Sequence, residues 1–432
     1  MKRIILGGLL TTVFTMNALS QSGSHSGSLS PYSQYGLGVL SDQAQVAVKG
    51  MAGTGIAMRG GTFVNTLNPA SYSAVDSLTM LFDAGLSGQF INFKEGANSV
   101  NARSADFDYA VGLFRVMPHL GVSFGVQPFS DIGYTYTSSL PLSSTLGSIV
   151  ETHSGSGGFH QAFIGAGWNP IEPLSIGFNA AYLWGTYDRS VASTATTEVN
   201  SLTKTYKASV NSYNLTLGMQ WAQSLGKKDV VTLGATVGLG HKLGADATCS
   251  IVNLNTSTLV SDTTEFVAAN GLELPLSYGV GLAWTHRQSL TVAADISQQK
   301  WGKVKFPDYD ELTRSYRRQS GLLTDRTRLS LGVDYVPHAL DVRSYLKRIH
   351  YRIGISHTTP YYKINGHDGP KQFAVSAGLG LPLQNAWNHR SVLNVSAQWE
   401  RTSATDFITD NTFRISVGLT FNERWFAKWR ID

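Results

Sequence analysis

The amino-acid sequence predicts an all-β fold, a transmembrane antiparallel β-barrel of about 14 strands with an N-terminal segment inside its lumen. Three observations support this prediction. Apolar residues alternate with small polar residues along most of the chain, and the links between the alternating segments are short and long in turn. Only 15% of the 432 residues are charged, and 44 are glycine. Soluble domains have about 25% charged residues, whereas a barrel strand alternates lipid-facing apolar and lumen-facing polar side chains.

The start of the chain predicts export. A basic pair, Lys2 and Arg3, precedes a mostly apolar stretch that ends in small residues before Gln21. This order is typical of a secretory signal peptide. A membrane anchor is less well supported, because the apolar stretch is shorter than the roughly 20 residues of a membrane helix. We expect residues 1–20 to be cleaved and the mature chain to lie in the outer membrane of a Gram-negative cell.

The last predicted strand shows the alternation clearly. Odd-numbered residues from Phe413 to Phe421 are apolar, and the even-numbered residues between them are polar or small. Successive side chains of a strand point to opposite faces, so one face meets lipid and the other meets the lumen. We expect a barrel over residues 77–422 and a periplasmic tail over residues 423–432. The predicted strands begin near Ser77, Asp106, Leu120, Gly158, Leu174, Tyr206, Val230, Pro275, Ser289, Arg326, Tyr351, Gln372, Val392 and Thr412.

The lengths of the links test the barrel independently. Outer-membrane barrels alternate short periplasmic turns with longer outer loops. The first nine predicted links alternate in this way, whereas residues 337–350 form a turn that is longer than expected. A soluble sandwich has no reason to alternate like this. The longest predicted outer links are residues 138–157, 185–205, 244–274 and 300–325.

The final strand has features that barrel-assembly machineries recognise. Ser416, Gly418 and Phe421 place a polar residue, a glycine and an aromatic residue in the terminal strand. Ordinary strand chemistry explains these residues equally well. We treat the three residues as a candidate export signal and expect contact with the barrel-assembly machinery during biogenesis.

The sequence does not indicate an enzyme. The 11 histidines are scattered, and Cys249 is the only cysteine, so neither an internal disulfide nor a cysteine-rich zinc site is expected. No serine lies in a nucleophile-elbow motif. The formal net charge of +5 is modest, and no basic cluster favours nucleic acid. We expect no cofactor, no metal site and no nucleic-acid partner, and we expect outer-membrane lipid around the barrel.

Residues 30–76 do not show strand alternation. Small residues and glycines let the backbone pack closely in a confined space. We therefore expect residues 21–76 to form an N-terminal segment and a hatch that fills the lumen. The candidate packing residues are Gly50, Gly53, Gly55, Gly60 and Gly61, and the candidate hatch motif is Asn68, Pro69 and Ala70.

The glycine-rich segment followed by Asn68-Pro69-Ala70 resembles the hatch of the long-chain fatty acid transporter family (FadL/TodX-like). The segment that begins Ser30-Pro31-Tyr32 resembles a Bacteroidota-type branch of that family. The resemblance is best over residues 30–140. It implies a fourteen-stranded barrel, a hatch in the lumen and uptake of hydrophobic molecules. It also implies a kink in the third strand that opens a lateral gap towards the membrane.

The third predicted strand contains Pro128, Phe129 and Gly133. Proline cannot donate to the strand ladder, so Pro128 lies at an edge or an interruption. These three residues are our candidates for the lateral gate. A tolerated bulge near the barrel rim is the alternative.

Two functions fit the sequence. The preferred one is uptake of small hydrophobic, fatty-acid-like molecules by lateral diffusion through a plugged barrel, which predicts an apolar cavity between hatch and wall. The alternative is a non-transporting accessory subunit of an outer-membrane protein secretion or assembly complex, with other outer-membrane proteins as partners. This alternative predicts a closed lumen and an apolar docking patch.

Overall fold

The computed structural model describes residues 30–77, 79–143, 147–195, 200–339, 341, 343–383, 391–404 and 407–424. The predicted signal peptide, and residues 425–432 of the predicted tail, lie outside the described residues. Within the described part of the chain, no helix is long and apolar enough to cross a membrane.

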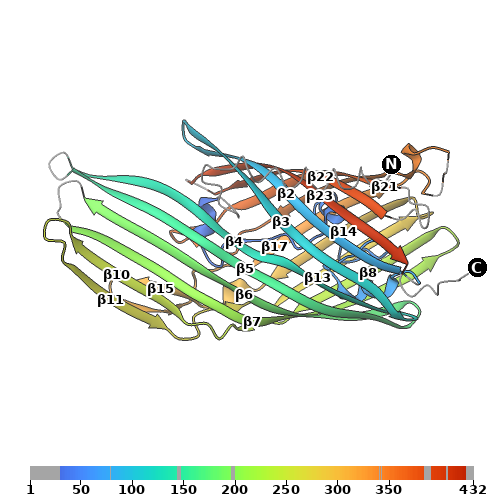
Figure 1. Ribbon diagram of the computed structural model, residues 1–432, viewed down its shortest axis with the longest axis horizontal. Coiled ribbons are helices and arrows are strands. Elements are labelled where there is room, and N and C mark those ends of the chain that lie inside the picture. The colour runs from blue at the N-terminus through green and yellow to red at the C-terminus, as the bar shows by residue number, and fades with distance from the viewer. Residues whose placement is uncertain are drawn as a thin grey trace, which may run out of the picture.

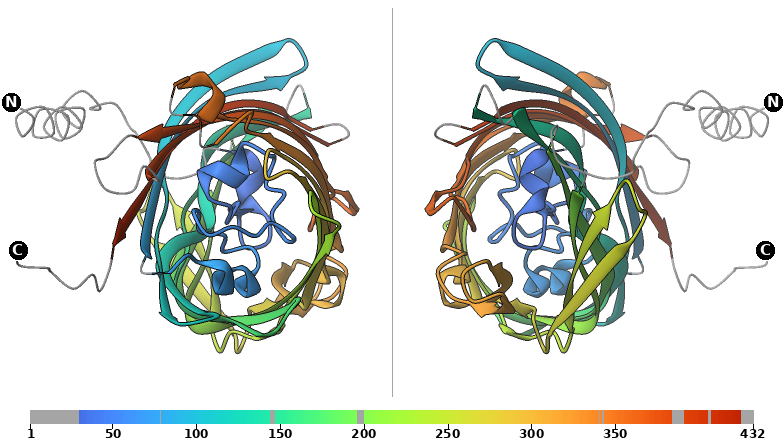
Figure 2. Two further views of the ribbon diagram at one scale, coloured as in Figure 1. Left: turned by 90° about the vertical axis from the view of Figure 1, so that its right-hand side faces the viewer. Right: turned by 90° about the vertical axis from the view of Figure 1, so that its left-hand side faces the viewer.

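Fourteen antiparallel strands form a closed barrel, which confirms the predicted fold and strand number (Figures 1 and 2). The barrel closes where the first wall strand pairs with the last, from Thr79 opposite Arg424 to Lys94 opposite Thr409. The last strand therefore includes Glu423 and Arg424, which differs from the predicted tail over residues 423–432. The wall strands are β2 (Thr79–Glu95), β3 (Asn98–Met117), β4 (Leu120–Ser143), β5 (Gly147–Ile171), β6 (Leu174–Ala195), β7 (Asn200–Leu225), β8 (Asp229–Gly238), β13 (Ser277–His286), β14 (Leu290–Gln299), β17 (Arg326–Tyr335), β18 (His350–Thr358), β21 (Lys371–Leu383), β22 (Ser391–Ser403) and β23 (Thr409–Arg424).

The wall is much taller on one side than on the other. Strands β4 to β7 each have 22 to 26 residues, whereas β8, β13, β14, β17 and β18 have nine or ten. Two further strands, β10 (Ala247–Asn255) and β11 (Ser261–Ala268), extend the tall side, because β10 pairs with the upper part of β7. The prediction of long outer links over residues 138–157, 185–205 and 244–274 was therefore wrong, since most of these residues are strand.

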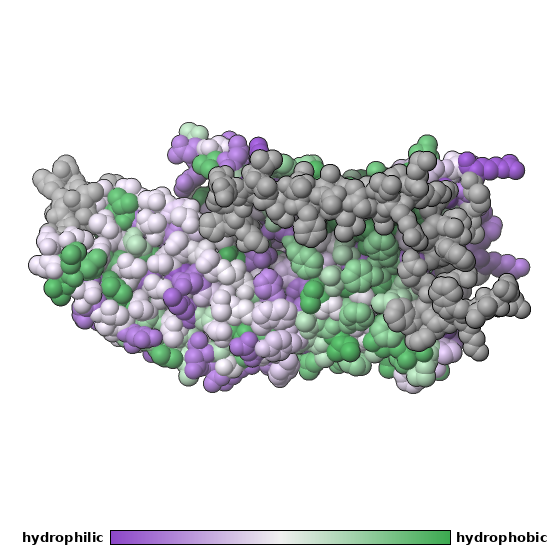
Figure 3. Space-filling model, viewed as in Figure 1, coloured by the Kyte–Doolittle hydropathy of each residue, from purple (hydrophilic) through white to green (hydrophobic). Residues whose placement is uncertain are grey.

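The tall side of the barrel extends from the membrane into the water, and the side chains of β7 show where this change of surroundings occurs. In its lower half the outward residues are apolar and exposed, as at Leu217 and Met219, and the inward residues are polar, as at Gln220. In its upper half the inward residues are apolar instead, since Ala208 and Val210 face inward and are buried. Figure 3 shows the apolar surface concentrated around the half of the barrel that carries the short turns. The strands continue beyond the lipid because their inward side chains pack in an outer cap.

The cap closes the outer end of the barrel. Its hydrophobic core contains Trp301, Tyr316, Tyr361 and Tyr362, which pack against inward residues of the tall strands. A packed apolar cluster thus covers the lumen at the outer end of the barrel. The smaller cap elements are β9 (His241–Lys242), β12 (Glu273–Leu274), η4 (Trp301–Lys303), β15 (Phe306–Asp310), β16 (Ser315–Gln319), β19 (Lys363–Ile364) and β20 (His367–Asp368); η5 (Leu346–Arg348) lies in the long turn between β17 and β18.

Residues 30–77, here called the luminal segment, lie inside the barrel (Figure 2). The segment starts in the cap, where Tyr32 and Leu37 are part of the apolar core, and ends at the first wall strand. Most of its residues are buried. Its elements are η2 (Pro31–Gln34), β1 (Val39–Leu40), α2 (Val46–Lys49) and η3 (Pro69–Ala74).

Candidate functional site

Glycines of the wall contact the backbone of the luminal segment directly. A Cβ atom at Gly177 would lie 2.5 Å from the carbonyl carbon of Pro69, and one at Gly378 would lie 2.9 Å from the Cα of Gly50. Real Cβ atoms do not approach backbone atoms this closely, so only glycine fits at these positions. The segment therefore packs against the wall without a gap at this level. Further wall glycines that contact the segment are Gly121, Gly167, Gly218, Gly234, Gly281, Gly332, Gly354 and Gly418.

Polar side chains of the wall bind the backbone of the segment. The Asp295 carboxylate accepts hydrogen bonds from the backbone N–H groups of Gly55 (2.6 Å) and Ile56 (2.8 Å). The Gln220 amide donates to the carbonyl oxygens of Ile56 (3.0 Å) and Met58 (3.1 Å). These buried groups would lose their partners if the segment moved, which costs about 1–3 kcal/mol for each group.

The Asn68-Pro69-Ala70 motif joins the segment to itself and to the wall. Asn68 is buried and caps η3, because its side-chain oxygen accepts a hydrogen bond from the Ala70 N–H (3.1 Å). Its amide nitrogen donates to the carbonyl oxygens of Ile56 (2.8 Å) and Met219 (3.1 Å). An asparagine suits this position because one side chain supplies both donors and an acceptor.

Two ion pairs connect the segment to the wall. Lys49 Nζ lies 2.7 Å from an Asp108 oxygen, and the two side chains are only 5% and 10% exposed. Arg328 donates to the Asp42 carboxylate (3.1 Å) and to the Ala52 carbonyl oxygen (2.9 Å). Burial opposes the charged form of Asp42, but Arg328 and then Lys49 outweigh it and hold the pKa of Asp42 below its ordinary value.

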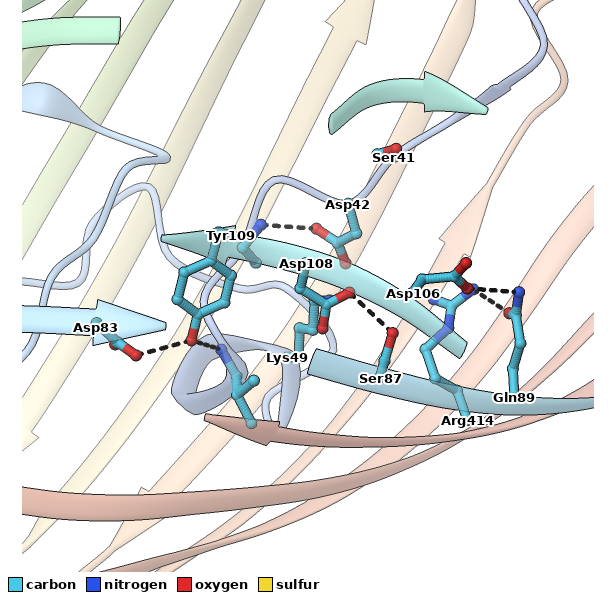
Figure 4. A network of polar contacts seen from close by, with 12 residues as sticks. Ser41, Asp42, Lys49, Asp83, Ser87, Gln89, Asp106, Asp108, Tyr109 and Arg414 are labelled. Atoms are coloured by element: carbon cyan, nitrogen blue, oxygen red, sulfur yellow. Dashed lines mark hydrogen bonds and ion pairs between the residues drawn. The ribbon is translucent and has the colours of Figure 1, made fainter. Parts of the chain in front are cut away.

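Figure 4 shows the polar network around Lys49 and Asp108. The Tyr109 hydroxyl donates to Asp83 and accepts from the Val46 N–H, both at 3.0 Å. Ser87 donates to Asp108 (2.9 Å), so the wall also holds the carboxylate that binds Lys49. The helix α2 is therefore fixed through its first and its last residue.

A cavity of about 370 Å³ lies between the luminal segment and the wall. Its lining residues are mostly polar or charged, with a smaller apolar part that includes Leu67, Phe107 and Phe129. The uptake interpretation predicts a mainly apolar cavity instead. Positive and negative groups are present in similar numbers, so the cavity has no strong preference for one sign of charge. Its charged lining includes Asp106, Asp131, Arg326, Arg328, Glu400 and Arg414.

One end of the cavity reaches a gap in the wall between β3 and β4. The ladder between these strands ends at Ala110 opposite Val126, although both strands continue. Directly after this point β4 has a bulge between Pro128 and Ser130, so the structure places Pro128 and Phe129 at the gap. The luminal segment covers the free edge of β4, because β1 pairs with Ser130 and Asp131.

The other predicted gate residue also contacts the luminal segment, because the Gly133 N–H donates to Ser33 Oγ (3.2 Å). Of the predicted packing glycines, Gly50 and Gly53 contact wall residues. Gly55, Gly60 and Gly61 instead contact side chains of the segment itself.

The candidate export residues lie on both faces of β23. Ser416 faces the lumen and is buried, and a Cβ at Gly418 would lie 2.9 Å from the Cβ of Val46. Phe421 faces the membrane and is paired with Phe82. Ser416 and Gly418 therefore also have a packing role in the folded barrel.

The charged residues that hold the luminal segment are not among the site residues predicted from the sequence. Asp295 and Arg328 lie on the lumen faces of predicted strands, where charges are rare, and this rarity was the available signal. Their partners lie more than 200 residues away in the chain, so periodicity could not pair them. Among the described residues, no group of three or more His, Cys, Asp or Glu side chains could hold a metal ion.

Comparison with known proteins identifies both the fold and the family. The toluene transporter TodX of Pseudomonas putida has a TM-score of 0.60 at 15% identity, covering 88% of this chain and 98% of that one. The toluene transporter TbuX of Ralstonia pickettii (TM-score 0.59, 11% identity) and a Pseudomonas aeruginosa FadL homologue (0.59, 10%) each cover 88% of this chain and 98% of their own.

These likenesses confirm the FadL-like fold, and such a barrel is an outer-membrane protein. A search of curated proteins found no match. A family model described as BamG matches residues 1–432, the entire chain. The chain therefore belongs to the BamG family, and it has the barrel fold of the FadL-like channels.

Proposed function

We propose that the protein is a non-transporting accessory barrel in a complex that assembles or secretes other outer-membrane proteins. The observation that supports this most strongly is the mostly polar lumen, in which the luminal segment packs directly against wall glycines. In this proposal, residues 30–76 are a fixed hatch, held by the glycine contacts and by Asp295 and Gln220. A route for hydrophobic molecules needs an apolar cavity, and the cavity here is charged. The family name adds support because it points to barrel assembly.

Purification from the native outer membrane tests this function. The full-length chain, with an affinity tag, is extracted in a mild detergent. We expect other outer-membrane proteins to co-purify at stoichiometric levels, with the barrel-assembly machinery among them. Depletion of the chain is expected to lower the amount of folded outer-membrane proteins in the cell. A FadL-like transporter tagged in the same way serves as the control. Isolation as a single barrel, with normal assembly after depletion, would refute the proposal.

A second candidate is uptake of small hydrophobic molecules through the gap between β3 and β4. It is supported by the position of the gap at one end of the cavity, next to Pro128 and Phe129. The solved proteins of the same fold include a monoaromatic hydrocarbon channel, CymD. Uptake of a hydrophobic probe by cells tests this candidate. Pro128→Ala should reduce uptake, whereas Pro382→Ala, which removes a proline from the paired strand β21, should not.

A further inference from the structure

The hairpin of β2 and β3 has one strand edge without a neighbouring strand. Pairing between β2 and β3 continues to Glu95 opposite Asn98, but pairing between β3 and β4 ends at Ala110. Residues 98–105 of β3, here called the open edge, therefore pair with β2 alone among the strands that the structure describes. On its other side the hairpin stays in the wall, because β2 pairs with β23 up to Lys94 opposite Thr409. Figures 1 and 2 show β4 diverging from the β3 side of the hairpin.

The open edge begins at the membrane surface. The Arg103 guanidinium lies 5.4 Å from the centre of the Phe90 ring. Phe90 is paired with Phe413, and Phe413 with Trp399, so an exposed aromatic row runs across three strands at this level. Aromatic rows mark the boundary between lipid and water. The open edge therefore rises from this boundary into the medium, and Val100 within it is 65% exposed.

The other side of the gap is already covered by this chain. Val39 and Leu40 of β1 pair with β4, and the Ser41 N–H donates to the carbonyl oxygen of Phe129 (3.0 Å). The fold thus supplies a two-residue strand to part of the free edge of β4, at Ser130 and Asp131. Within the described part of the chain it supplies none to the facing edge of β3. The geometry of the gap accepts an added strand, because β1 is such a strand.

The open edge lacks the features that normally protect strand edges. Proteins usually protect an edge with proline, lysine, a bulge or a short strand. Residues 98–105 contain no proline and no lysine, and Arg103 is their single charged residue. The register shift of this hairpin lies below the open edge, at Gly85 and Leu86. An unprotected edge of this length favours strand addition, in which main-chain hydrogen bonds give affinity and alternate side chains give specificity.

We propose that the open edge is a strand acceptor, whose ligand is an extended segment of a partner outer-membrane polypeptide that pairs with β3. The proposal rests on the proposed accessory function. Cross-strand pairing predicts an apolar or β-branched partner residue opposite Val100 and an acidic one opposite Arg103. The acceptor lies outside the lumen, so it functions with the luminal segment in place.

Site-specific cross-linking in native outer membranes tests the proposal. The photo-reactive amino acid benzoylphenylalanine is placed singly at positions 99, 100, 101 and 102 of the full-length chain, and the cross-linked residues are mapped by mass spectrometry. We expect positions 100 and 102 to cross-link to residues about two apart in one segment of one partner. This register distinguishes strand pairing from contact through side chains alone. Cross-links that scatter over a partner, that reach a second copy of this chain, or that are absent at all four positions would overturn it.

A lysine at the edge provides the matched variant. Val100→Lys should lower cross-linking from position 102 at least tenfold, because lysine disfavours edge pairing, and it should leave the heat stability of the barrel unchanged. Leu312→Lys is the control, since Leu312 is also apolar and is 96% exposed at the turn between β15 and β16. Equal cross-linking in both variants would overturn the acceptor. If both variants still co-purify with partner proteins, the proposed accessory function holds even though the strand acceptor is refuted.

Discussion

The ion pair between Lys49 and Asp108 gives a quantitative test of how firmly the luminal segment is held. Lys49→Met keeps an unbranched side chain but removes the ammonium group 2.7 Å from the carboxylate. Removing one partner of a buried ion pair costs about 3–5 kcal/mol. We expect about 3 kcal/mol, the lower end, because both residues line the polar cavity. At about 1.4 kcal/mol for each factor of ten, α2 should open about 140-fold more often.

Amide hydrogen exchange of the purified protein in detergent measures this opening. The Gly50 N–H, which donates to the Val46 carbonyl oxygen (3.1 Å), should exchange about two orders of magnitude faster in Lys49→Met. The double variant Lys49→Met with Asp108→Leu should regain most of the protection, because an apolar pair can replace a buried ion pair at little cost. A change below tenfold in the single variant, or no recovery in the double variant, would refute the assigned role of this pair.

Three further predictions concern the fit of the luminal segment. Gly177→Leu should prevent the folded, heat-resistant barrel from forming, whereas Gly88→Ala should not, because a Cβ at Gly88 has its nearest neighbour at 4.0 Å; gel mobility without heating checks both. Asn68→Ala should lower the free energy of unfolding in urea by about 1–3 kcal/mol, because it leaves buried groups without partners, and an unchanged midpoint would contradict this. Because the pKa of Asp42 is lowered, its contribution to stability is present above the ordinary pKa of 3.8 and is lost as the pH falls below it. The protection of the segment's amides, measured against the intrinsic exchange rate at each pH, should therefore fall at pH values below 3.8 in the wild type, and Asp42→Asn should reduce this dependence.

The wall of the barrel could be predicted from the sequence because each strand has one lipid-facing side. Over β23 every second residue from Phe413 to Phe421 is apolar, and the structure places these residues on the outer face. The predicted start of β4 at Leu120 agrees with the structure, and so does that of β6 at Leu174. Lipid requires an apolar residue at every second position, so the pattern is regular wherever a strand crosses the membrane.

The upper parts of the tall strands escaped prediction because their alternation has the opposite phase. Even-numbered residues of β7 face inward throughout, but Gln220 is polar and Val210 is apolar. Outside the lipid the inner face is the dry one, so the apolar residues change sides. The Thr- and Ser-rich outer faces of residues 185–194 and 200–205 then resemble a loop in the sequence. A change of phase within an alternating segment is the signal that would have revealed the cap.

The contacts of the luminal segment also set the free-energy cost of opening a route for a molecule through the lumen. Moving the segment aside would leave Asp295, Gln220 and Ser376, which accepts from the Ala52 N–H (2.7 Å), without their backbone partners. At about 1–3 kcal/mol for each buried group, these three alone give about 3–9 kcal/mol. An opening that costs about 6 kcal/mol is populated roughly once in 20,000 molecules, at about 1.4 kcal/mol for each factor of ten. A route through a displaced segment is thus closed nearly all the time. The cavity reaches the gap between β3 and β4 with the segment in place. The open edge lies at the same gap, so occupancy of that edge by a partner strand would close the gap as well.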